Sequence, residues 1–86
     1  MRARVDWMQY PGDDRILELL DESGMILSPA VIAANIDLSR EYITRRLKAL
    51  REHELVERVD TGRGHHQITQ KGKKYLSGEL DESCLK

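Results

Sequence analysis

Two helix-start signals only eleven residues apart constrain this chain more than any other feature. Ser28-Pro29 places a capping hydroxyl before a proline, whose missing N–H costs nothing in the first helical turn. Ser39 offers a second cap, and three apolar residues with the spacing of one helix stripe follow it: Ile43, Leu47 and Leu50. The pattern predicts a short helix over residues 28–35, a tight turn, and a longer helix over residues 39–54.

The segment before this pair predicts another helix. Residues 13–23 carry apolar side chains at helical spacing, and Asp13 or Asp14 can cap their first turn. The apolar run at residues 25–27 is long enough only for a very short strand. A third helix therefore precedes the two closely spaced ones.

The segment after the pair predicts a hairpin and a last helix. Residues 55–59 alternate partly in polarity, as a strand does, and residues 65–68 form the returning strand. The turn at 61–64 holds two glycines that can take positive φ. Thr69 caps a final helix over residues 70–76. The order predicts a mainly α fold with a small β-hairpin, which is a winged helix-turn-helix.

With 86 residues the chain has room for one domain. We expect that domain at residues 13–76, between an N-terminal arm at 1–12 and a loosely ordered acidic C-terminal tail at 77–86. Phe is absent, so the core is small and aliphatic, and such cores often gain stability by dimerising. A homodimer is expected, with contacts from the arm and the last helix: Trp7, Met8, Tyr10, Tyr75 and Leu76.

The formal net charge of −1 hides a strong asymmetry. Residues 1–38 carry net −4, residues 39–74 carry net +5, and residues 75–86 carry net −2. A basic middle between acidic ends can present a surface to phosphates. A mixed, solvated surface explains the same distribution equally well.

Several stretches resemble archaeal winged-helix transcriptional regulators: residues 36–50 (IDLSREYITRRLKAL), 54–59 (ELVERV) and 68–76 (ITQKGKKYL). Asp6-Trp7-Met8 and residues 14–18 (DRILE) are most similar to haloarchaeal proteins grouped with the repressor of halophage phi-H. The similarity extends from about Asp6 to Leu80. It implies a regulator of transcription, most simply a repressor.

A helix fits the major groove of duplex DNA, and the helix over residues 39–54 is the candidate reader. We expect Arg45 to read a base, and Arg40 and Lys48 to contact phosphates. Glu41 accepts a hydrogen bond from cytosine or orients Arg45 as an i, i+4 partner. Arg46 lies nearer the apolar stripe, where its stem packs and its charge bonds a carboxylate, so it is not a reader. An ordinary exposed helix of mixed charge is the alternative for this face.

The hairpin tip and the first serine cap complete the predicted surface. The basic turn reaches an adjacent minor groove or its phosphates, unless it is simply a solvated turn. Ser28 bonds a phosphate at a helix start or serves only as a cap. The expected DNA-binding residues are Ser28, Ser39, Arg40, Glu41, Tyr42, Thr44, Arg45, Lys48, Arg63 and His65.

Other functions find little support in the residues. No metal-ligand spacing links the histidines with Cys84, and no nucleophile–base pair or phosphate loop occurs, so we expect neither a cofactor nor an enzyme. One cysteine and the lack of a long apolar run favour a cytoplasmic protein without a membrane partner or a small-molecule substrate. A winged-helix module that binds another protein remains the rival to DNA binding, because the net charge is near zero.

Overall fold

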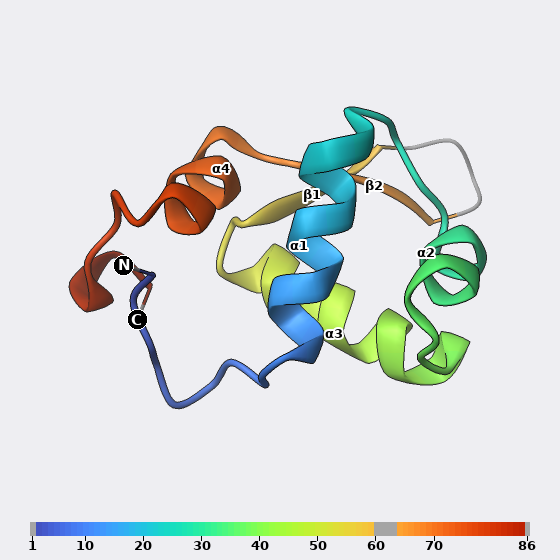
Figure 1. Ribbon diagram of the computed structural model, residues 1–86, viewed down its shortest axis with the longest axis horizontal. Coiled ribbons are helices and arrows are strands. Elements are labelled where there is room, and N and C mark those ends of the chain that lie inside the picture. The colour runs from blue at the N-terminus through green and yellow to red at the C-terminus, as the bar shows by residue number, and fades with distance from the viewer. Residues whose placement is uncertain (1, 60–63, 86) are drawn as a thin grey trace.

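The computed structural model describes residues 2–59 and 64–85. Its elements, in chain order, are α1 (Gly12–Ser23), α2 (Pro29–Ile36), α3 (Arg40–Glu52), β1 (Val56–Val59), β2 (His65–Ile68), α4 (Gln70–Ser77) and a 3₁₀ turn, η1 (Glu82–Leu85). Figure 1 shows α1 crossing the middle of the molecule, with α2 on one side and α4 with both termini on the other. The predicted mainly α winged helix-turn-helix is confirmed.

The two serine caps form as expected. Ser28 Oγ accepts a hydrogen bond from Val31 N at 3.3 Å, and Ser39 Oγ accepts one from Tyr42 N at 3.1 Å. Asp37 ends α2 in the left-handed region with φ 53°, which turns the chain sharply toward α3. The α3 stripe of Ile43, Leu47 and Leu50 is buried in the core, so the opposite side of α3 faces outward.

The hairpin pairs β1 with β2 in antiparallel register, with Val56 opposite Ile68 and Arg58 opposite His66. Side chains of directly paired residues share one face of the sheet. Val56 and His66 are buried, so this face lies against the helices. Leu27 adds a single bridge to His66, with two backbone hydrogen bonds of 2.8 and 2.9 Å. The short strand expected at residues 25–27 is thus reduced to that bridge.

The last helix packs closely against the start of the wing. Thr69 Oγ1 caps α4 by accepting from Gly72 N at 3.0 Å. A Cβ at Gly72 would lie 2.3 Å from the Leu55 carbonyl oxygen, so only glycine allows this approach.

Two predicted boundaries are wrong. The N-cap position of α1 is Pro11, without a side-chain cap, and the carboxylates of Asp13 and Asp14 lie buried in the first turn. Asp13 instead reaches back and accepts from Gln9 N at 3.0 Å. The other helix, α3, stops at Glu52 instead of residue 54, because Glu54 takes a left-handed conformation with φ 64°.

The two terminal segments pack on the body of the subunit. The Trp7 ring stacks on His53 with centroids 3.8 Å apart, and Trp7 Nε1 donates to the Leu85 carbonyl at 2.7 Å. Leu85 is fully buried in the core. The expectation of a loosely ordered tail is therefore wrong, because η1 brings an apolar anchor back to the N-terminal segment.

Candidate nucleic-acid interface

The outer face of α3, which we define as Arg40, Glu41, Thr44, Arg45 and Lys48, is exposed along its whole length. The capping hydroxyl of Ser39 fixes where the helix begins, and the buried stripe fixes which side turns out. The predicted reader helix is thus accessible, and no other part of the described subunit covers Arg45.

The cations on the outer face of α3 have no partner within the described subunit. The side chains of Arg40, Arg45 and Lys48 make no hydrogen bond or ion pair with any described residue. The possible Glu41–Arg45 pair does not form either, among the same residues. Thr44 Oγ1 donates to the Arg40 carbonyl at 2.9 Å, so its hydroxyl proton is used within the helix. Three positive charges are therefore free to meet an anionic surface.

Tyr42 is turned away from this face. Its hydroxyl donates to Gln9 Oε1 at 2.8 Å, and its ring lies so close to Gly12 that a Cβ there would lie 2.6 Å from the hydroxyl oxygen. Tyr42 thus ties α3 to the start of α1. Tyr42 is half-buried on the flank of α3 that packs on α1, and its predicted part in DNA binding stays a prediction.

Arg46 occupies the position expected of it. Its guanidinium donates to both carboxylate oxygens of Asp13 at 2.8 Å and to the Trp7 carbonyl at 3.1 Å. Hydrogen bonding to Asp13 raises the pKa of Arg46. The two adjacent arginines therefore have different roles, because Arg46 holds α3 in the fold and Arg45 faces outward.

The part of the wing that the structure describes next to the predicted DNA-binding surface is its base, at the start of β2. His65 is half-buried at the start of β2, opposite Val59, and Arg63 lies outside the described residues. Ser28, half-buried, stays in its capping role at the start of α2. Gly64 lies near that start, where a Cβ on it would lie 3.9 Å from Pro29 Cδ.

A cavity of about 210 Å³ lies where the wing base, α2 and α3 meet. Arg51 and Arg58 line it with His66, and the expected site included neither of these two arginines. Arg51 continues the exposed stripe of α3 at the i, i+7 position from Thr44, which is a signal available in the sequence. Arg58 and His66 come together only through strand register, which no local pattern reveals.

The expected dimer residues fall into two groups. Met8 and Tyr75 are buried in the subunit's own core, and Tyr75 Oη donates to Asp14 Oδ1 at 2.5 Å. These two side chains cannot reach a partner in this fold, so we correct their assignment to a dimer surface. Trp7 and Leu76 are half-buried and Tyr10 is 38% exposed, with the Arg4 guanidinium 4.1 Å above its ring.

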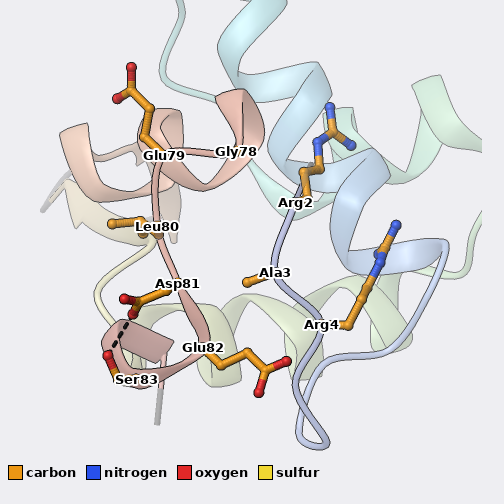
Figure 2. Close-up of a pocket in the computed structure, with 9 residues that line it drawn as sticks. All are labelled: Arg2, Ala3, Arg4, Gly78, Glu79, Leu80, Asp81, Glu82 and Ser83. Atoms are coloured by element: carbon orange, nitrogen blue, oxygen red, sulfur yellow. Dashed lines mark hydrogen bonds between the residues drawn. The ribbon is translucent and has the colours of Figure 1, made fainter.

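A larger cavity, of about 730 Å³, lies between the two terminal segments (Figure 2). Figure 2 shows Arg2 and Arg4 pointing toward α1 and away from residues 78–83. Arg2 donates to Glu18 at 2.8 Å, and both arginines donate to Asp14, so their charges are neutralised within the subunit. The residues that line this cavity come from the two terminal segments, which lie on the opposite side of α1 from α2 (Figure 1).

Residues 2–59 and 64–85 contain neither a cluster of metal ligands nor a membrane-spanning helix. No group of three His, Cys, Asp or Glu side chains is placed to hold a metal ion. None of the helices has the length and apolar character needed to cross a membrane.

A helix-turn-helix with an exposed basic second helix, followed by a wing, defines the class of winged helix-turn-helix proteins. The chain belongs to the winged helix-turn-helix phage repressor family, whose model matches residues 1–86. The predicted resemblance to the phi-H repressor group is confirmed by this match and by the structural similarity described next.

Two solved structures are similar to the chain. The PhiH1 repressor-like protein from Haloarcula marismortui is 36% identical, with a TM-score of 0.82 over 93% of this chain and 89% of that one. A cysteine-to-serine mutant of Lactococcus lactis ZitR is 26% identical, with a TM-score of 0.70 over 88% of this chain and 53% of that one. Comparison with curated proteins gave no significant match. The family is described as one of winged helix-turn-helix phage repressors, and the haloarchaeal neighbour is described as repressor-like.

Proposed function

We propose that the chain is a sequence-specific repressor that binds double-stranded DNA through the outer face of α3. The observation that carries this proposal is the set of three unpaired cations there, on a helix exposed by the helix-turn-helix. The major groove, about 12 Å wide, admits one α-helix. A relative described as repressor-like supports the regulatory role.

Each exposed side chain has a proposed part in recognition. Arg45 offers two donors to the acceptors of guanine, and Glu41, which has no arginine partner here, accepts from cytosine. The exposed Thr44 offers its methyl group to thymine. Arg40 and Lys48 neutralise phosphates on either side. The wing, residues 61–66, rests on the adjacent backbone or minor groove.

We further propose that two copies bind together. Successive major grooves on one face of DNA lie about 34 Å apart. The subunit is 32 Å along its longest axis, a length comparable with that spacing. The surface that remains for this contact includes Trp7, Tyr10 and Leu76, and binding should saturate at two chains per duplex.

Selection of bound sequences from a random duplex pool at two salt concentrations tests the proposal. We expect an enriched motif, and an affinity that falls with salt by a log–log slope of about −0.9 per phosphate contact. Arg45→Ala should cost about 1–3 kcal/mol on the selected duplex and relax preference at one base pair. Arg15→Ala, which removes an exposed cation from α1, is the matched control.

Two results would contradict parts of this proposal. An equal loss on all sequences would make Arg45 a phosphate contact. The absence of binding to any duplex would favour the protein-interaction module, which the net charge of −1 also allows.

A further inference from the structure

We propose that the cavity at the base of the wing is a phosphate site, in which Arg51 and Arg58 hold a backbone phosphate of the bound duplex. This inference rests on the proposed function and adds two residues, from two elements, to the contact surface. The cavity has about 210 Å³, enough for a phosphate group and water, and is also lined by Pro29, Thr44 and Gly64.

The charges around this cavity are unbalanced. The side chain of Arg58 is exposed and makes no hydrogen bond or ion pair with any residue that the structure describes. Arg51 is half-buried, and the one hydrogen-bond partner of its side chain among those residues is the ring of His66. Among the described residues, none of the side chains that line the cavity is a carboxylate, although Glu54 and Glu57 line a neighbouring cavity together with the same two arginines. Two positive charges thus meet at the cavity without an ion pair to any described carboxylate, and the guanidinium fork matches phosphate oxygens.

A hydrogen-bond chain holds Arg51 in place. His66 Nδ1 lies 2.7 Å from the Gly64 carbonyl oxygen, which can only accept, so this nitrogen carries the proton. His66 Nε2 then accepts from Arg51 Nη1 at 2.9 Å. The remaining N–H groups of Arg51 stay available to an anion. His66 is therefore a positioning residue, which fixes one arginine relative to the wing.

The site is continuous with the outer face of α3. Thr44 belongs to both, and Lys48 and Arg51 follow it at i+4 and i+7 on the same side of the helix. Arg58 projects from the sheet face that lies against the helices, beside the same cavity. A duplex whose major groove holds α3 therefore brings its backbone to the base of the wing. A free phosphate offers the same chemistry, and the experiment separates the two sources.

The test compares the salt dependence of binding to a random-sequence duplex for the natural chain and its variants. We expect Arg58→Gln to reduce the slope by about 0.9 and to weaken binding equally on all sequences. Arg58→Lys keeps the charge and should keep the slope. Arg15→Gln, on α1, should change neither. Arg51→Gln should reduce the salt slope as Arg58→Gln does, and a thermal melt checks that this variant folds. If Arg51→Gln does not fold, the result for Arg58→Gln decides the test.

The outcomes separate this inference from the proposed function. If the natural chain binds DNA, and Arg58→Gln has the same salt slope and affinity as Arg15→Gln, the proposed phosphate site is wrong and the proposed function stands. If the natural chain binds no duplex, the proposed function fails. Titration with inorganic phosphate then decides whether the cavity is a site for free phosphate. Saturable amide shifts at Gly64 and His66, lost in Arg58→Gln, would support a site for free phosphate, and their absence would overturn it.

Discussion

At the residue scale, the buried His66 connects the core to an arginine at the base of the wing. Its ring is only 4% exposed, and both ring nitrogens are occupied by Gly64 and Arg51. Burial lowers the pKa of His66 from its ordinary value of 6.5, and the nearby charges of Arg51, Arg58 and His65 lower it further. Protonation would place a second donor against the Arg51 guanidinium, so the folded state favours the neutral ring.

This lowered pKa predicts the pH dependence of stability. The unfolded chain binds a proton at His66 more readily than the folded chain, so the free energy of unfolding should fall as the pH drops below about 6.5 and level off above it. Urea unfolding at a series of pH values measures the effect. In His66→Gln this pH dependence of the unfolding free energy should be lost, and in His65→Gln it should remain. Equal slopes in the natural chain and both variants would contradict the assignment of the pH dependence to His66.

At the element scale, the pair of Asp13 and Arg46 joins the first turn of α1 to the middle of α3. The side chain of Asp13 is fully buried and that of Arg46 is 11% exposed. Because Arg46 also donates to the Trp7 carbonyl, one guanidinium holds three segments together. The angle at which α3 presents its outer face thus depends on a residue that never meets the ligand.

Removal of one partner should be costly, because it leaves a buried charge unpaired. We expect Arg46→Met to lower the free energy of unfolding by about 3–5 kcal/mol, and the double variant Asp13→Leu/Arg46→Met to lose much less. Arg45→Met, one residue earlier and exposed, should change stability by about 0.5 kcal/mol or less. Urea denaturation gives all three values, and a loss in the double variant equal to that of Arg46→Met would argue against the pair.

Local signals explain which parts of this arrangement were predictable from sequence. Serine caps and an apolar stripe act over one or two turns, so the two central helices and the exposed arginine follow directly from them. The fixing of Tyr42 by Gln9 and the convergence of Arg51 with Arg58 depend on contacts between elements. Contacts of this kind cannot be inferred from the position of a side chain around its own helix.

At the scale of the whole molecule, the two terminal segments close the fold. Trp7 lies between His53 at the end of α3 and the backbone of Leu85, so both ends of the chain meet beside the core (Figure 1). The acidic composition of the last ten residues predicted a loose tail. It misled because one buried leucine can hold a short polar segment when an aromatic partner lies near the other end of the chain.

Leu85 should therefore contribute to stability as a core residue does. Leu85→Ala should lower the free energy of unfolding by about 2–5 kcal/mol, through the lost apolar burial and the cavity it leaves. Because Trp7 is the only tryptophan, its fluorescence reports on the same contact, and emission should move to longer wavelength in the variant. Glu79→Ala, at an exposed position of the same segment, should leave both readings unchanged. Unaltered Trp7 emission and stability in Leu85→Ala would mean that the terminal segments do not hold each other in solution.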